Sequence, residues 1–295
     1  MYKQDTIQPS APPPQYYPQL GNPQQHQLHQ HQLHQHQSHQ HQSHHQRQLT
    51  KAEKVQQLLS KYDLNPVISE KLGILSNFEI ALIIDDSGSM NTPLNDGSGH
   101  ATRWDELKSV MKIVLDIALT FDDDGIDMYF LNRENVYGVT SYEQIEYTMS
   151  IPPSGVTNLK GTSEQLYSDY TNHSKKVLQV ICTDGLPTNG FGNPDINGFT
   201  ECIKKRNCDK FYISILACSD NDKDVGYLEK LDKTVKNVDI LDDYISEKKQ
   251  VLKVQGRKFK YEFNDHIVRL LLGPIIPELD ALDEYPLSGC RCSIL

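Results

Sequence analysis

Residues 79–89 read EIALIIDDSGS, and this stretch decides the fold class. Its apolar part, from Ile80 to Ile84, does not alternate with polar residues as a strand with one solvated face would. A continuous apolar run of this length is typical of a parallel strand that other elements cover on both faces. The run ends abruptly at Asp85, where polar and small residues begin. The stretch therefore predicts a buried strand with a polar loop at its carboxyl end.

Short apolar runs recur along the chain, and segments with helical periodicity lie between them. Further strands are expected at residues 126–131, 136–140, 177–182, 211–216 and 238–241. Helices are expected at 51–62 and 103–120, with Thr50 and Thr102 as N-caps, and then after 159, after 194, around 225–231 and around 265–272. Strands that alternate with helices imply crossover connections. We therefore expect a doubly wound α/β fold, in which a mostly parallel central sheet has helices on both faces.

Composition divides the chain into four parts. Residues 24–48 are almost only Gln and His, and a stretch rich in Pro and Tyr precedes them. Neither segment has enough apolar side chain to offset the entropy of ordering, so residues 1–49 are expected to be a disordered tail. Residues 50–76 are expected to form a helical lead-in, 77–273 one folded domain and 274–295 a flexible tail. The Gln/His tract is interpreted as a spacer, with metal binding by its histidines as the alternative.

Charge and cysteine usage argue against some function classes. The formal net charge is −10 and no cluster of Lys and Arg stands out, which argues against electrostatic binding to nucleic acid. No apolar run is long enough to span a bilayer, and Met1–Gln4 contains no apolar signal segment. Cys182 and Cys218 lie inside apolar runs, where a free thiol packs as a small hydrophobic group. We therefore expect a cytoplasmic protein with reduced thiols.

Polar residues follow two of the expected buried strands. Asp85, Ser87 and Ser89 follow the first, Asp184 follows the strand at 177–182, and Thr157 lies between them in the sequence. Ligands of such sheets bind beyond the carboxyl ends of the strands, where the strand order reverses. Hydroxyl and carboxylate oxygens are the donors that a hard cation such as Mg²⁺ prefers. We therefore expect the three hydroxyls to contact the ion and the two carboxylates to hold its water molecules and balance its charge.

These five residues carry a resemblance to a known family. Roughly two-thirds of the chain resembles a von Willebrand factor A-type domain. Asp85, Ser87 and Ser89 match the metal-ion-dependent adhesion motif of that family, Thr157 matches its second-loop threonine, and Asp184 matches its third-loop aspartate. The resemblance implies a bound Mg²⁺, Mn²⁺ or Ca²⁺ and a protein-binding role rather than turnover. An ion held by neutral hydroxyls stays electron-poor, so it would accept an Asp or Glu carboxylate from a protein partner.

Several residues near the motif have alternative interpretations. Taken singly, Asp-Ser-Gly-Ser and Asp-Gly are ordinary turn sequences, and only their combination in this order favours a metal site. Thr162 is an alternative to Thr157, because the second loop reads Ser-Gly-Val where family members often have paired glycines. Asp86 is expected to point to solvent at the rim of the site. Asp122–Asp124 is expected to be a solvated turn rather than a calcium site.

The last residues, Cys292-Ser-Ile-Leu295, fit a prenylation box, and the terminal Leu favours a geranylgeranyl group on Cys292. A chance cysteine near the end is the alternative interpretation. One prenyl chain anchors a protein only marginally, and the acidic tail has no polybasic stretch to assist it. Cys290 is therefore the candidate second anchor, through palmitoylation. These residues lead us to expect a lipid anchor at the cytoplasmic face of a membrane.

The sequence thus predicts a metal-dependent adaptor that captures an acidic residue of a protein partner and is not an enzyme. One alternative is a Rossmann-like phosphatase or phosphotransferase with Asp85 as nucleophile. Against it, such sites usually have a second carboxylate two residues on, where this chain has Ser87, and no Lys or Arg clamp is evident near the strand ends. A serine hydrolase is disfavoured because no Gly-x-Ser-x-Gly motif surrounds the serines. The other alternative is a scaffold with a vestigial metal site.

Overall fold

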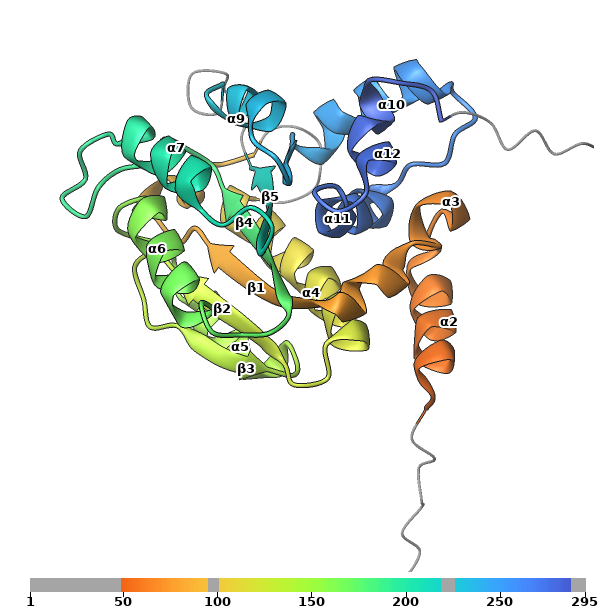
Figure 1. Ribbon diagram of the computed structural model, residues 1–295, viewed down its shortest axis with the longest axis horizontal. Helices are drawn as coiled ribbons and strands as arrows, with labels where there is room; N and C mark the ends of the chain where they lie inside the picture. Colours follow the sequence, from red (N-terminus) through yellow and green to blue (C-terminus); the bar gives the residue numbers. More distant parts are fainter. Residues whose placement is uncertain (1–48, 95–100, 219–225, 288–295) are drawn as a thin grey trace, which may run out of the picture. The chain divides into compact units, whose positions relative to one another are not determined.

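The computed structural model of the chain describes residues 49–94, 101–218 and 226–287 (Figure 1). Contacts divide the chain into two units, 1–48 and 49–295, and the second unit holds all the elements described below. The expected disorder of the Gln/His tract therefore concerns residues that the structure does not describe. Within the described ranges, no helix is long and apolar enough to cross a membrane.

A six-stranded sheet forms the centre of the fold, in the order β3-β2-β1-β4-β5-β6. Neighbouring strands are parallel except β2 and β3, so the predicted α/β class with a mostly parallel sheet is confirmed. From β1 the chain passes to β2 and β3 on one side and then returns to β4 on the other, so the strand order reverses between β1 and β4. The strands are β1 Phe78–Ile84, β2 Ile126–Phe130, β3 Val136–Val139, β4 Lys176–Thr183, β5 Phe211–Ala217 and β6 Val238–Leu241.

Helices connect and cover the strands (Figure 1). The α-helices are α2 Lys51–Tyr62, α3 Pro66–Ser69, α4 Arg103–Phe121, α5 Glu143–Ser150, α6 Leu159–Asp169, α7 Ile196–Lys205, α9 Leu228–Thr234, α10 Tyr244–Gln255, α11 Phe263–Leu272 and α12 Pro277–Asp280. The described ranges also contain the short 3-10 helices η1 Leu72–Asn77, η2 Gly88–Asn91 and η3 Ala281–Asp283.

The apolar side chains form two clusters on opposite faces of the strands. Successive residues of a strand point to opposite faces, and Ile80 and Leu82 of β1 lie in one cluster while Ala81 and Ile83 lie in the other. The first cluster includes buried residues of α4 and α11, and the second includes buried residues of α6, α7 and α9. This division explains why β1 reads as a continuous apolar run: both of its faces are covered.

The predicted helix starts are confirmed in detail. The Thr50 hydroxyl accepts a hydrogen bond from Glu53 N, and the Glu53 carboxylate accepts one from Thr50 N, which completes a capping box at α2. Thr102 caps α4 through a 3.2 Å bond from Asp105 N to its hydroxyl. Both caps satisfy backbone donors that have no partner inside the helix.

The prediction of an exposed tail after residue 273 is wrong as far as residue 287. Leu279 and Leu282 are 3% and 0% exposed, and α12 and η3 carry them. The Gln255 amide of α10 donates to the carbonyl oxygens of Leu282 and Tyr285, at 2.6 and 2.7 Å. The prolines and acidic residues of this segment concealed an apolar face of widely spaced residues. The helix α10 was also not predicted, since few apolar residues mark its sequence.

His266 lies in α11 and is 1% exposed. Its Nδ1 is 3.1 Å from the Tyr261 hydroxyl, and its Nε2 has no hydrogen-bond partner among the residues described. Burial, with the nearby positive charge of Arg269 as a smaller cause, lowers the pKa of His266 to about 3. The imidazole is therefore neutral in the folded protein over the whole range in which a free His titrates.

When the pH is lowered from 7 to 5, the free energy of unfolding is expected to fall by about 2 kcal/mol because of His266. The unfolded chain takes up a proton near the ordinary His pKa of 6.5, whereas the folded chain stays neutral down to about pH 3. Stability therefore falls as the pH falls through this window. Urea denaturation of the parent and of His266→Gln at both pH values measures the effect.

The pH dependence of His266→Gln should be smaller by that amount, even though the variant loses packing at both pH values. An equal pH dependence in the two proteins would contradict the assignment.

Candidate metal centre

Three loops meet at the carboxyl ends of β1 and β4. The two strands are parallel neighbours with Ile84 opposite Cys182, and the pairing continues beyond β1 because Asp85 N donates to Cys182 O at 3.0 Å. The residues that directly follow the two strands, Asp85 and Asp184, therefore lie at one edge of the sheet, at the point where the strand order reverses.

Four of the five predicted ligands belong to one hydrogen-bonded group, which we call the strand-end cluster: Asp85, Ser87, Ser89 and Asp184. The two serine hydroxyls are 3.0 Å apart, and the Ser89 hydroxyl donates to Asp184 Oδ1 at 2.7 Å. Ser87 N donates to Asp85 Oδ1 at 2.9 Å. Thr183, the last residue of β4, donates its hydroxyl to Asp85 Oδ2 at 2.5 Å. Side chains from two separate loops thus form one group of oxygen atoms.

The structure ties Thr157, the fifth predicted ligand, to the loop after β4. Thr157 N donates to the Thr188 hydroxyl at 3.0 Å, and Thr188 N donates to Thr157 O at 2.8 Å. Thr157 is 7% exposed and lies two residues before α6. Thr162, the alternative, lies inside α6. No hydrogen bond joins either threonine to the strand-end cluster in the described part of the chain, so the assignment of the third hydroxyl stays a prediction.

The second loop is fastened to the first by its backbone. Gly88 N donates to Gly155 O at 3.2 Å, and Ser154 N donates to Asp86 O at 2.8 Å. Gly155 has φ +103°, and a Cβ at this position would lie 2.2 Å from Asn132 Oδ1. The position therefore accepts glycine alone without rearrangement.

The expectation that Asp86 points to solvent is wrong. Asp86 is 1% exposed, its Oδ2 is 2.6 Å from Arg133 Nε, and its Oδ1 accepts a 2.8 Å bond from Asn132 N. Its partners follow β2 and are remote in sequence, which is why the local pattern did not reveal them. Asp86 holds the loop after β2 against the strand-end cluster instead of contributing charge to the rim.

Burial and a neighbouring charge perturb Asp85. Burial, with the negative charge of Asp184 as the second cause, raises the pKa of Asp85 to about 6. The hydrogen bonds from Ser87 and Thr183 oppose this rise, because they stabilise the carboxylate form. A nearby cation would favour the charged form of Asp85 against both burial and the charge of Asp184.

Arg103 supplies one such cation and was missed by the sequence analysis. As the first residue of α4, it reaches Asp184, with Nη1 2.7 Å from Oδ2. Its side chain is 13% exposed, and that of Asp184 is 0% exposed. The expectation that no Lys or Arg clamp lies near the strand ends is therefore wrong. The absence of such a clamp no longer counts against a phosphatase or phosphotransferase. The sequence feature that could have indicated a role for Arg103 is its position at the start of a helix, directly after the Thr102 N-cap.

The donor set suits a hard divalent cation. All candidate donors are oxygens, two of them neutral hydroxyls and two of them carboxylates. Arg103 binds Asp184 through Oδ2 and leaves Oδ1 with Ser89. A divalent ion would therefore meet two carboxylates whose charge is balanced only in part by one guanidinium.

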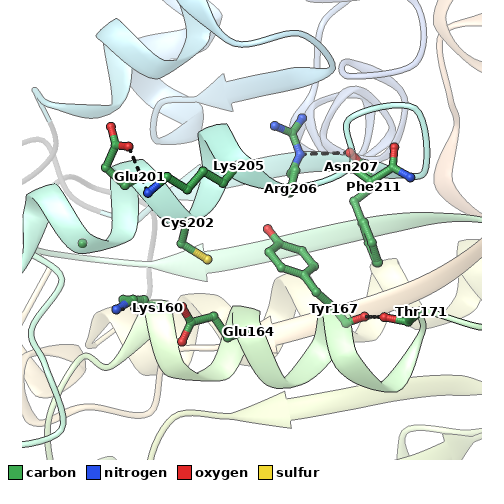
Figure 2. Close-up of a pocket in the computed structure, with 11 residues that line it drawn as sticks. Lys160, Glu164, Tyr167, Thr171, Glu201, Cys202, Lys205, Arg206, Asn207 and Phe211 are labelled. Atoms are coloured by element: carbon green, nitrogen blue, oxygen red, sulfur yellow. Dashed lines mark hydrogen bonds and ion pairs between the residues drawn. The ribbon is translucent and has the colours of Figure 1, made fainter.

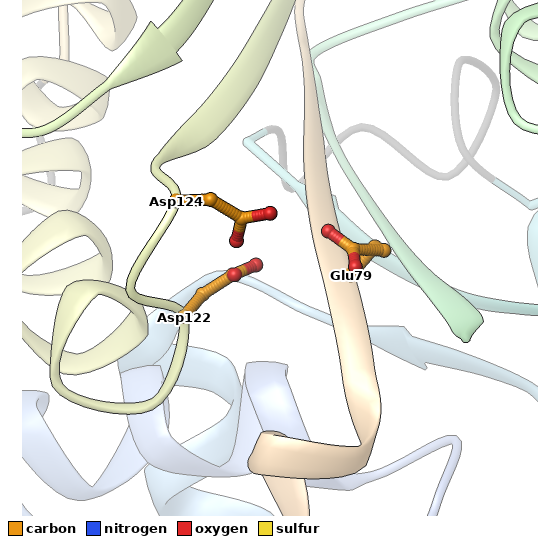
Figure 3. A group of neighbouring side chains, drawn as sticks. All are labelled: Glu79, Asp122 and Asp124. Atoms are coloured by element: carbon orange, nitrogen blue, oxygen red, sulfur yellow. The ribbon is translucent and has the colours of Figure 1, made fainter. Parts of the chain in front are cut away.

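Asp122 is not part of a solvated turn, although Asp123 and Asp124 are exposed as predicted. Asp122 is 1% exposed, and its Oδ2 accepts a 3.2 Å bond from Ile80 N. Figure 3 shows its carboxyl group facing those of Asp124 and Glu79. Burial raises the pKa of Asp122 to about 7, with its contact to Asp124 as the next cause. We call these three residues the Lys175 acidic cluster, because Lys175 Nζ is 3.0 Å from Glu79 and 3.9 Å from Asp122.

A groove of about 500 Å³ lies elsewhere, between α6 and α7 (Figure 2). Its lining includes Phe211, the first residue of β5, so it lies towards the amino end of that strand, away from the strand-end cluster. Arg206 in its wall donates to the carbonyl oxygens of Ile203 and Phe211, at 2.9 and 3.0 Å. Its guanidinium thus holds backbone segments together.

Comparison with known proteins gives little further information. No protein-family model matches the chain, and no curated protein matches it. Among solved structures, the PilB minor pilin from Streptococcus sanguinis is similar at 16% identity and a TM-score of 0.39, and a point mutant of it at 14% and 0.42. In each case 56% of this chain aligns, and the chain spans 57% of the length of the pilin chain. A likeness at this level carries no argument about function.

Replacing Arg103 by Met is expected to destabilise the protein by about 3 kcal/mol in metal-free buffer. The change leaves the buried Asp184 carboxylate without its ion-pair partner. In the Asp184→Asn background the same change should cost much less, because no charge remains to be compensated. Urea denaturation of the parent, the two single variants and the double variant gives the coupling energy.

Lys61→Met is the matched control, since Lys61 pairs with Asp116 at the surface. Exposed pairs contribute about 0.5 kcal/mol. If Arg103→Met cost no more than this control, the pair with Asp184 would not stabilise the cluster.

Proposed function

We propose that this chain is a protein-binding module of the von Willebrand factor A type that works through a divalent cation. The preferred ion is Mg²⁺, with Mn²⁺ and Ca²⁺ as alternatives. The binding partner is a protein that presents an Asp or Glu side chain. The doubly wound sheet of that family forms part of the proposal. It is supported by the reversal of strand order at β1 and β4 and by apolar clusters with helices on each face.

One observation carries the proposal. Hydroxyls and carboxylates from the ends of β1 and β4 form a single hydrogen-bonded group at the point where the strand order reverses. This is the position at which sheets of this kind bind their ligands. A turn that served only the fold would not need a second carboxylate from a different strand beside it.

Each residue of the proposed metal centre would have a distinct role. The hydroxyls of Ser87 and Ser89 would contact the ion directly, with Thr157 as the third hydroxyl. Asp85 and Asp184 would accept hydrogen bonds from water molecules on the ion and balance its charge. Thr183 and Arg103 hold those two carboxylates in place, through contacts of 2.5 and 2.7 Å. When bound, the ion would supply an open position for the carboxylate of a partner.

Arg103 adds to this arrangement in two ways. Its positive charge lies beside Asp184 and lowers the affinity for a cation, because like charges repel. The same charge would attract an anionic side chain of a partner. The module would therefore bind its ion weakly when alone and more tightly when the carboxylate of the partner arrives.

A phosphotransfer role for Asp85 is the competing function, and the guanidinium of Arg103 favours it. The geometry of Asp85 opposes it. Asp85 is 0% exposed, its Oδ1 accepts from Ser87 N and its Oδ2 accepts from Thr183. Because the side chain is closed off from solvent, a phosphoryl group could reach neither oxygen without rearrangement of the loop. The expected lipidation of Cys292 and Cys290 concerns residues outside the described ranges and stays a prediction.

The full chain is expected to bind one Mg²⁺ at this centre, and binding should be lost in Asp85→Ala and in Ser87→Ala/Ser89→Ala. At a Mg²⁺ concentration tenfold above the dissociation constant, the free energy of unfolding of the parent should rise by about 1.4 kcal/mol. Titration calorimetry and urea denaturation measure the two effects. The variants keep the Gln/His tract, so a difference between them and the parent reports the strand-end cluster.

Ser154→Ala is the matched control, because this serine is exposed in the neighbouring loop and is fixed by its backbone. It should bind Mg²⁺ as the parent does. With Mg²⁺ present, sodium acetate should stabilise the parent more than sodium chloride does. Absence of saturable binding at 10 mM ion, on the order of the weakest useful affinity, would favour the scaffold with a vestigial site.

A further inference from the structure

Three carboxyl groups meet beside β6, the strand at one edge of the sheet. Asp239 belongs to the edge strand β6, Asp232 to α9 and Asp280 to the end of α12. One oxygen from each lies within 4.8 Å of the others. We call these residues the β6 acidic cluster. Acidic groups alone do not define a site, so the state of each carboxylate matters.

Asp239 is buried in a way that an ordinary carboxylate is not. It is 1% exposed, and neither of its carboxylate oxygens has a hydrogen-bond partner in the described part of the chain. Asp232 Oδ1 is also buried without a partner. A buried charge without hydrogen bonds strongly destabilises a folded protein. The cluster therefore contains buried carboxylate oxygens without hydrogen-bond partners, and a bound cation or proton would stabilise them.

In the described part of the chain, no charged side chain donates a hydrogen bond to either oxygen of Asp239. A Cβ at Gly273 would lie 1.6 Å from Asp239 Oδ2, so the carboxylate packs directly on the C-terminal cap of α11. The C-terminus of a helix carries partial negative charge, which repels a carboxylate. Ser214, opposite Asp239 on β5, has a buried hydroxyl that lacks a partner as well.

Arg269 is a neighbouring cation whose charge favours the ionised form of Asp239, but its Nη atoms bind other groups and its Nε has no hydrogen-bond partner among the described residues. Arg269 forms ion pairs with Glu247 and, at 2.8 Å, with Asp283, and it donates to Asp280 O at 2.7 Å. Among the described residues, no ion pair joins Lys, Arg or His to the β6 acidic cluster. One guanidinium thus stands among five acidic side chains. The Lys175 acidic cluster differs, since an ammonium group lies within 3.9 Å of two of its members.

We propose that Asp232, Asp239 and Asp280 bind a hard divalent cation, Ca²⁺ in particular, which fastens the C-terminal segment 274–287 to the edge of the sheet. Oxygens within 4.8 Å of one another can share one Ca²⁺, which takes oxygen ligands at about 2.4 Å in irregular geometry. The smaller Mg²⁺ requires closer and more regular ligands. The site is separate from the strand-end cluster and does not depend on it.

Without the ion, the cluster has one other way to lower its charge, which is to keep a proton. Burial raises the pKa of Asp239 well above its usual range; the charge of Arg269 opposes this rise, and the carboxyl group of Asp280 adds to it. A proton shared between Asp239 and Asp280 would satisfy one pair of oxygens and leave Asp232 unsatisfied. The cation satisfies all three, so the two states can be distinguished by experiment.

The test is hydrogen exchange of the full chain in EDTA and in 5 mM CaCl₂, well above the dissociation constant of about 1 mM or less that a carboxylate-rich site should have. Ca²⁺ should slow the exchange of the Leu279, Asp280 and Tyr285 amides at least about tenfold, because these amides hold α12 and η3 together. In Asp239→Asn, which keeps the shape of the side chain, Ca²⁺ should leave their exchange unchanged.

Two further variants serve as controls. Asp124→Asn removes a charge from the Lys175 acidic cluster, and Asp85→Ala disables the strand-end cluster; both should retain the full effect of Ca²⁺ on the three amides. Asp280→Asn, at a half-buried position, replaces Asp239→Asn should that variant fold poorly, and it should lose the effect as well. The proposal is overturned if Ca²⁺ does not slow exchange in the parent. It is also overturned if Ca²⁺ slows exchange in Asp239→Asn and Asp280→Asn as much as in the parent.

Discussion

The parallel pairing of β1 with β4 is the constraint on which the candidate metal centre depends. It runs along the whole of β1 and continues to Asp85, so it determines how close the residues after the two strands must come. The consequence is a conflict, because Asp85 and Asp184 are both buried and both acidic. The surroundings reduce this conflict with a hydroxyl from Thr183, a hydroxyl from Ser89 and the guanidinium of Arg103. Each of these groups also holds a carboxylate in one orientation, as a preorganised ligand set requires.

Much of the fold was predictable because it rests on local patterns. Apolar runs gave the strands, three- and four-residue spacing gave α4, and Thr50 and Thr102 marked helix starts that the structure confirms. The predicted residues Asp85, Ser87, Ser89 and Asp184 lie together because parallel strands bring their carboxyl ends to one edge.

The failures share one physical reason, which is that the partner of a charged side chain is remote in sequence. Asp86 looked like a rim residue because Arg133 follows a different strand. Asp122 looked solvated because its contact with Ile80 N crosses to β1. Arg103 was overlooked because Asp184 lies eighty-one positions away. The segment after residue 273 was misjudged because its apolar residues are sparse and interrupted by charge. Composition near a residue cannot reveal such partners, whereas the topology can.

The position of Asp239 has a further consequence for how the chain avoids self-association. β6 is an edge strand, and edge strands expose backbone groups with which a second chain could pair. Proteins discourage such pairing with short edge strands and with charged side chains that point inwards. β6 has only four residues, and one of them is the buried Asp239. A strand added at this edge would have to pair beside a buried acidic side chain, which disfavours association with a second chain.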